Sequence, residues 1–264
     1  MAAMHSVLKN VREVHSYPWP HVVVKNAVDY YDELATTRPD LHTVINGCAY
    51  GENTRYDLES PSALKLPNLS PVWREFIEYH SSADFWRDIV RVFGEHIAAI
   101  YPDLNPFKPP ACPKSDTKIT IRCKVGVNTP TSKESSVRGL HVDSTNELVA
   151  GLLYMPLPED DAGGELEIHE LTAFPQFRPP AELLPGLSRY VKTVPYKPNT
   201  LFMFINTDFS IHSVTPRKPT KLERRFASFA IDVDRPIFNI YGPPELVLPE
   251  YERERACEKA AGAG

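Results

Sequence analysis

The sequence predicts a mainly β fold, a sandwich or barrel of short strands, with α-helices in its N-terminal third. Three observations carry this prediction. Residues Lys118–Asn128 alternate strictly between apolar and polar side chains, which is the period of a strand with one buried face. Short apolar runs then follow one another as far as Val233, and turn-forming residues separate them. Apolar residues at helical spacing occur mainly before Pro110.

The N-terminal third is expected to start with a short strand and to continue into helices. Ser70 and Pro71 are typical of a helix start, because a serine side chain caps free N–H groups and proline fits the first helical position. Ser82 can cap a further helix in the same way. The expected elements are a strand at Pro20–Val24, a helix at Ala27–Thr36, a loop at Gly47–Ser62, a helix at Val72–His80 and a helix from Ser82 to Tyr101.

The core after Pro110 is expected to consist of strands. Leu148–Met155 is a continuous apolar run, as in a strand buried on both faces. The strands expected after it are Glu165–His169, Val191–Val194, Thr200–Ile205, Ile211–Val214 and Phe226–Val233. Together the elements predict one domain over residues 1–264, with a mostly helical flank at 1–110, a β core at 111–240 and a C-terminal tail at 241–264.

Composition restricts the class of protein. Hydrophobic residues make up 42% and charged residues 24%, which is ordinary for a globular chain. The net charge of -5 gives no basic excess, so no nucleic-acid partner is expected. The sequence contains no Cys-x-x-Cys pair, so no structural zinc site is expected. Because no apolar run reaches transmembrane length and no leader sequence is recognisable, we expect a cytoplasmic protein, a monomer or homodimer, with no membrane partner.

His141, Asp143 and His212 are the candidate metal ligands. On a strand, residues two apart such as His141 and Asp143 point to the same face. His212 would then come from a distant strand that folds back beside them. Two histidines and one carboxylate are the ligand set of mononuclear iron(II) sites that keep coordination positions open. Either histidine could instead be a structural residue of the core.

The order of these features resembles the double-stranded β-helix core of the iron(II)/2-oxoglutarate-dependent oxygenases, and most of all their prolyl-4-hydroxylase-like branch. The resemblance spans about residues 118–232, less than half of the chain. The motifs that carry it are His141-x-Asp143, Gly163-Gly164-Glu165-Leu166, His212-x-Val214 with Pro216, and Arg225-Phe226-Ala227. It implies a jelly-roll, cupin-like core with Fe(II) as the metal, 2-oxoglutarate as co-substrate and O2 as oxidant.

Carried over to this sequence, the resemblance makes His141, Asp143 and His212 the iron ligands, which are the catalytic residues. It makes Arg225 the partner of the C5 carboxylate of 2-oxoglutarate, because a guanidinium binds a carboxylate through two hydrogen bonds. Arg224 is adjacent, and strand alternation would turn it to the opposite face. The arginine-aromatic-small pattern favours Arg225 over Arg224.

Five further residues are weaker candidates. Many relatives carry a tyrosine on the strand before His-x-Asp, where this sequence has Arg122 and Lys124. These cations could contact the co-substrate or an anionic substrate, and Tyr154 could supply the hydroxyl group. Arg138 is a candidate substrate contact, although a solvated loop charge is the simpler interpretation. Asn206 is equally a candidate substrate contact or a turn residue.

The sequence thus predicts a dioxygenase that hydroxylates, or otherwise oxidises, an unactivated C–H bond of a small molecule such as an amino acid or a biosynthetic intermediate. One alternative is a cytoplasmic prolyl-type protein hydroxylase. An alternative of another class is a metal-binding or sensor protein that uses the same scaffold without turnover. The substrate depends on loops such as 47–62 and 129–138, which one sequence does not decode.

Overall fold

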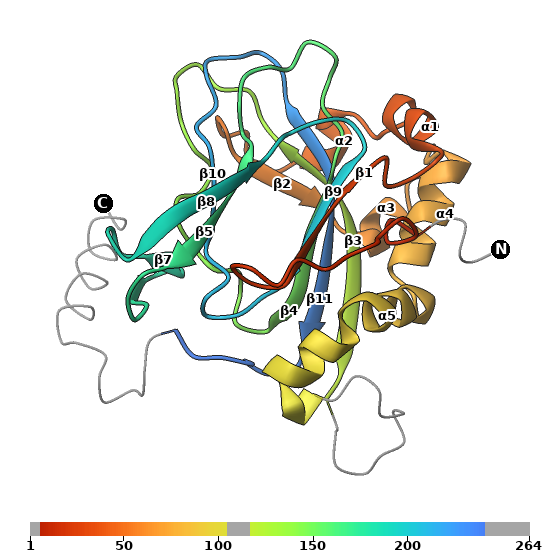
Figure 1. Ribbon diagram of the computed structural model, residues 1–264. Coiled ribbons are helices and arrows are strands. Elements are labelled where there is room, and N and C mark those ends of the chain that lie inside the picture. The colour runs from red at the N-terminus through yellow and green to blue at the C-terminus, as the bar shows by residue number, and fades with distance from the viewer. Residues whose placement is uncertain (1–5, 105–116, 241–264) are drawn as a thin grey trace, which may run out of the picture.

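Two antiparallel sheets face each other and form the β core (Figure 1). The structure is a computed structural model that describes residues 6–104 and 117–240. The large sheet has the strand order β1-β9-β4-β11-β3-β2, the small sheet has the order β10-β5-β8, and β6 pairs with β7. The strands are β1 (His21–Lys25), β2 (Arg55–Leu58), β3 (Ile119–Asn128), β4 (Glu147–Tyr154), β5 (Leu166–Leu171), β6 (Phe177–Arg178), β7 (Glu182–Leu183), β8 (Ser188–Val194), β9 (Thr200–Ile205), β10 (His212–Val214) and β11 (Arg224–Val233).

The chain passes back and forth between the two sheets, which makes the core a jelly roll. Strand β4 belongs to the large sheet, β5 and β8 to the small one, β9 to the large one, β10 to the small one and β11 to the large one. Strand β11 lies between β3 and β4, so Ala227 pairs with Val125 on one side and with Leu153 on the other. The predicted mainly β, jelly-roll core is confirmed.

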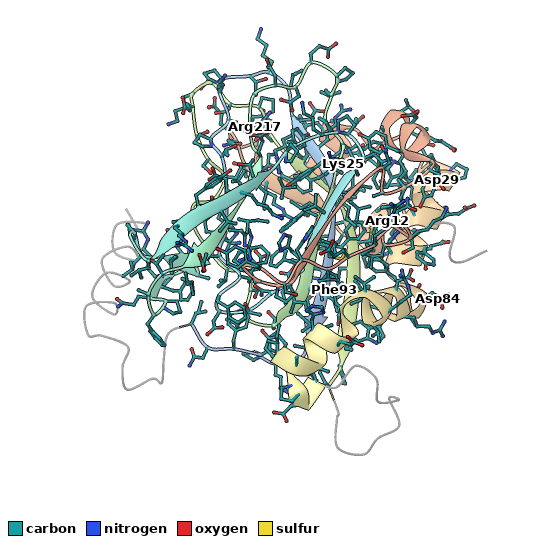
Figure 2. All side chains as sticks on the ribbon, in the orientation of Figure 1. Arg12, Lys25, Asp29, Asp84, Phe93 and Arg217 are labelled. Carbon is teal, nitrogen blue, oxygen red and sulfur yellow. The ribbon has the colours of Figure 1, made fainter. Side chains whose placement is uncertain are left out.

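Helices cover the outer face of the large sheet (Figure 1). They are α1 (Tyr31–Thr36), α2 (Leu41–Ile45), α3 (Ser60–Ala63), α4 (Pro71–His80), α5 (Ala83–Ile100) and the 3-10 helix η2 (Pro102–Leu104). The predicted caps are confirmed, since the Ser70 and Ser82 side chains accept hydrogen bonds from the first turns of α4 and α5. Phe93 of α5 is fully buried between that helix and the large sheet (Figure 2). Apolar burial therefore fixes the helical flank to the β core.

Two N-terminal expectations need correction. The segment 47–62, expected as a loop, contains β2 and α3, because β2 pairs with the edge of β3 and Ser60 Oγ donates a 2.5 Å hydrogen bond to Cys123 O. The helix expected at 27–36 begins only at Tyr31, since the Asn199 side chain binds both the N–H and the C=O of Val28 and so occupies the groups that a helix would use. The boundary at 110/111 and the predicted tail at 241–264 lie outside the described residues.

A second apolar cluster lies between the two sheets and surrounds the candidate functional site. Its members are Trp19, Ala150, Tyr154, Leu166, Ile168, Val194, Tyr196, Phe202, Phe204 and Phe226. Trp19 also donates a 3.1 Å hydrogen bond from Nε1 to His169 O and so ties the N-terminal segment to the small sheet. Because these apolar side chains fill part of the space between the sheets, polar groups occupy only the remainder.

Arg217 begins the polar run at residues 217–221 but is not a surface residue. Its side chain is fully buried among the loops at one end of the two sheets (Figure 2). The guanidinium donates hydrogen bonds of 3.1 and 2.8 Å to Thr129 O and Leu222 O. A buried guanidinium that binds two main-chain carbonyls joins two loops at a site where water is excluded.

None of the helices within 6–104 and 117–240 combines the length and apolarity needed to span a membrane.

Phe229 tests the attachment of the helices to the sheet. It is buried on β11, with ring centroids 5.6 Å from Phe85 of α5 and 6.0 Å from Phe76 of α4. Phe229→Ala should lower the free energy of unfolding by about 3–5 kcal/mol, the range for loss of a buried phenylalanine. Urea denaturation measures the change. Phe174→Ala is the control, because Phe174 is 85% exposed, and an equal loss in both variants would contradict the assignment.

Candidate metal centre

Three side chains that can bind a metal meet between the two sheets. Ligand atoms of His141, Asp143 and His212 all lie within 4.8 Å of one another. The Asp143 carboxylate is 3.6 Å from His141 Nε2 and 3.7 Å from His212 Nε2. Within the described ranges, no other group of three such side chains comes as close together. The three residues chosen from the sequence are therefore brought together by the fold.

Main-chain pairing places the two histidines side by side. The His141 N–H donates to His212 O at 3.0 Å, and the His212 N–H donates to His141 O at 3.1 Å. His212 begins β10, as expected, but His141 forms only an isolated bridge and Asp143 lies before the start of β4. The expectation that His141 and Asp143 lie together on a strand is wrong, because the chain makes a turn at residues 144–147 before β4 begins.

Each histidine is oriented by a hydrogen bond at its other ring nitrogen. His141 Nδ1 lies 2.7 Å from Gly139 O, and His212 Nδ1 lies 3.0 Å from Ser210 O. A carbonyl oxygen only accepts, so Nδ1 carries the proton in both rings and Nε2 keeps its lone pair toward Asp143. Backbone carbonyls commonly orient metal-binding histidines in this way.

The protonation states also suit a metal. Burial, followed by the neighbouring His141, lowers the pKa of His212 to about 3, so its ring is neutral at physiological pH. Burial alone would raise the pKa of Asp143. The neighbouring His212, His141 and Arg138 outweigh burial, and the pKa of Asp143 falls below its usual range. A neutral imidazole and an ionised carboxylate are the ligand forms.

Asn206 connects the segments that carry the ligands. It is fully buried, and its Oδ1 accepts from the Asp143 N–H at 3.3 Å and from Ser210 Oγ at 3.2 Å. Its Nδ2 donates at 2.9 Å to Ser144 O and to Glu147 O. Since Ser210 O in turn orients His212, one amide side chain positions parts of both metal-binding segments. It does not line the cavity, so the predicted substrate contact is replaced by a positioning role.

The three ligands open into a cavity of about 390 Å³ between the sheets. Part of its wall is apolar and comes from Ala150, Leu152, Leu166, Phe202 and Phe204. Its charged lining residues are Arg55, Asp57, Lys124, Arg138, Asp143, Glu147 and Arg224. Sequence reasoning missed Arg55, Asp57 and Glu147, because their role depends on the pairing of β2 with β3 and on the turn before β4.

Arg224, and not Arg225, lines the cavity, so the face chosen from the sequence is corrected. Arg225 lies on the other face, where it pairs with Glu223 at 2.6 Å. The even positions of β11 include polar Ser228 and Asp232, whereas Ala227, Phe229, Ile231 and Val233 at odd positions pack under the helices. That difference between the two faces was readable in the sequence and favours Arg224.

The remaining predicted residues divide between the cavity and its surroundings. Lys124 lines the cavity and binds Glu59 at 3.0 Å, and Arg138 lines it and binds Asp143 at 3.2 Å. Arg122 instead forms ion pairs with Asp232 and Glu59 and does not line the cavity. Tyr154 is fully buried, with its ring centroid 5.2 Å from the guanidinium carbon of Arg224.

Arg224 and its neighbours leave three hydrogen-bond donors unused. Arg224 donates to Gly164 O at 2.7 Å and to Asn128 Oδ1 at 3.3 Å. Among the described residues, no partner is present for three buried atoms, which are Arg224 Nη2, Tyr154 OH and Asn128 Nδ2. Buried donors without acceptors are costly. Their grouping beside the cavity suits a ligand that brings acceptor oxygens, such as a carboxylate.

Comparisons with known proteins give distant structural similarities. No protein-family model and no curated protein matches the sequence. A prolyl-4-hydroxylase from Pseudomonas putida is 13% identical over 88% of this chain and 98% of its own, with a TM-score of 0.45. A dioxygenase for auxin oxidation from rice is 16% identical over 89% of this chain and 77% of its own, with a TM-score of 0.36.

A third solved structure, an oxidoreductase of the 2OG-Fe(II) oxygenase family from Burkholderia pseudomallei, is 17% identical and has a TM-score of 0.32. It covers 64% of this chain and 59% of its own. These three structures are thus a prolyl-4-hydroxylase, a dioxygenase and an oxidoreductase of the 2OG-Fe(II) oxygenase family.

Asn206→Ala tests the positioning of the metal ligands. Loss of its four hydrogen bonds should lower the affinity for Co(II) by roughly 10–100-fold, the effect of removing a group that orients ligands. Competition with a chromophoric chelator measures the dissociation constant. Asn68→Ala is the matched control, since Asn68 is exposed. Unchanged affinity in Asn206→Ala would show that the ligands need no such support.

Proposed function

We propose that this protein is an iron(II)- and 2-oxoglutarate-dependent oxygenase that oxidises an unactivated C–H bond of a small molecule. The observation that carries the proposal is the His141–Asp143–His212 group, with both Nε2 atoms turned toward one carboxylate inside a cavity. Two imidazoles and one carboxylate hold a metal from one side and leave its other positions open.

The donor set also fits the co-substrate. A dicarboxylate that reaches from the metal to the far end of the cavity would place its second carboxylate near Arg224. Arg224 Nη2, Tyr154 OH and Asn128 Nδ2, which otherwise stay buried without acceptors, would then donate to it. Arg224 also lies 5.0–5.2 Å from the ring centroids of Tyr154, Tyr196 and Phe226, which fixes its plane before any ligand arrives.

Different residues of the chain would have different roles in this reaction. His141, Asp143 and His212 hold the metal, and Arg138 keeps the Asp143 carboxylate in place through its 3.2 Å contact. Iron(II) with 2-oxoglutarate and O2, when bound, supplies an oxidation in which 2-oxoglutarate becomes succinate and carbon dioxide and a C–H bond of the substrate is oxidised. Phe202 and Phe204 exclude water from one wall of the cavity.

Succinate release tests the activity. The protein with Fe(II), 2-oxoglutarate and O2 should form succinate slowly alone and faster with a metabolite substrate, and His212→Ala should lose both succinate formation and metal binding. His42→Ala is the control, because His42 is exposed on α2. Metal binding without succinate would favour the sensor alternative. Stimulation by a prolyl peptide, and by no metabolite, would favour the protein-hydroxylase alternative.

The two adjacent arginines test the co-substrate site. Arg224→Lys keeps the charge but loses the two-pronged geometry, so it should raise the KM for 2-oxoglutarate by at least about tenfold, or about 1.4 kcal/mol. Arg225→Lys should leave that KM within about twofold, because Arg225 pairs with Glu223 outside the cavity. Initial rates of succinate formation measure both constants. The reverse pattern would return the assignment to Arg225.

A further inference from the structure

Glu147 lines the cavity, and its carboxyl group has no role in the proposed reaction. It begins β4, and its backbone is fixed, since its N–H donates to Ser144 O and its C=O accepts from Asn206 Nδ2. The side chain is partly buried, and no described residue donates a hydrogen bond to it. Burial, followed by the nearby charges of Asp143 and Asp232, raises the pKa of Glu147 to about 8, and the nearby cations Arg55 and Lys124 oppose that rise without forming an ion pair with Glu147. A carboxyl in this position is stabilised by a cationic partner.

Two cations line the same cavity from β2 and β3. Lys124 Nζ contacts Glu59 at 3.0 Å, and an ammonium group has further N–H donors beyond that one pair. Arg55 directs Nε and Nη2 to Asp57 at 2.9 and 3.3 Å, which leaves Nη1 for another acceptor. The cavity therefore offers one unpaired acidic group together with donors of two basic groups.

The space left for a substrate is small. A volume of about 390 Å³ lies near the lower end of the roughly 300–1,000 Å³ of typical ligand pockets. In the proposed reaction, 2-oxoglutarate takes part of this volume at the Arg224 end. The remaining space suits a small molecule, and its lining carries both signs of charge.

We infer that the substrate is a small zwitterion of the α-amino-acid class, whose ammonium group binds Glu147 and whose carboxylate binds Lys124 and Arg55. This inference rests on the proposed function for its reaction but not for its binding. The opposite charges of an amino acid match the two kinds of group on the wall, and the ammonium supplies the direct ion-pair partner that Glu147 lacks among the described residues. A neutral segment of a peptide chain would leave Glu147 without a direct ion pair.

Calorimetric titration tests this site separately from turnover. The Fe(II)-loaded protein, held without oxygen and with 2-oxoglutarate, is titrated with the twenty proteinogenic L-amino acids. The tightest ligand is then compared with its N-acetyl derivative and with its carboxamide. Each modification should weaken binding by at least about tenfold, or about 1.4 kcal/mol. If none of the twenty binds, or if neither modification matters, the inference is overturned.

Two variants assign the ends of the ligand. Glu147→Gln should reduce the preference for the free amine over the N-acetyl form to below about threefold and keep the preference for the free carboxylate. Lys124→Met should do the opposite. Glu78→Gln, on the exposed face of α4, should keep both preferences. Unchanged preferences in Glu147→Gln and Lys124→Met overturn the inference.

The outcomes for binding and for reaction are separable. Amino-acid binding with the predicted preferences but no succinate would leave the inference standing and refute the oxygenase proposal. Succinate formation stimulated only by molecules without an amino group would do the reverse. Should Glu147→Gln fail to fold, as judged by circular dichroism, Lys124→Met and the modified ligands still decide.

Discussion

The reciprocal pairing of the His141 and His212 backbones is the constraint on which the site depends. Two hydrogen bonds join segments that are far apart in the sequence, and each ring is then oriented by a carbonyl only two residues earlier in its own segment. The geometry of the ligands is thus set by main-chain atoms, which are the least mobile part of a folded chain. Asn206 adds the link to Asp143 and completes this hydrogen-bonded frame.

The space between the sheets has both an apolar and a charged lining, two environments that are usually separate. Aromatic residues such as Phe202 and Phe204 make one part apolar, while charged groups from both sheet edges reach into the same cavity. Low polarity strengthens each electrostatic interaction there and makes every unpaired polar atom costly. The buried atoms without partners beside Arg224, and the free Glu147 carboxyl, are therefore the places where a ligand contributes most.

The sequence predicted the fold class and the helix caps from local spacing, and it identified the three candidate ligands that the fold brings together. Alternation along 118–128 and the short residue pattern around His141 are readable without tertiary information. Arg55 and Asp57 were missed, since only the pairing of β2 with β3 brings them to the cavity. The choice between Arg224 and Arg225 failed for a different reason: a motif outweighed the polarity of the two strand faces.

The turn Gly163-Gly164 shows how closely the two sides of the barrel depend on each other. A Cβ atom at Gly163 would lie 2.6 Å from Pro216 O, and one at Gly164 would lie 2.9 Å from Arg224 Cδ. Both glycines have positive φ, which other residues rarely adopt. Because Gly164 and Arg224 occupy neighbouring volume, these positions should change together during divergence. A homologue with a side chain at 164 would need a shorter cation at 224, and this part of its cavity wall would be rebuilt from that exchange.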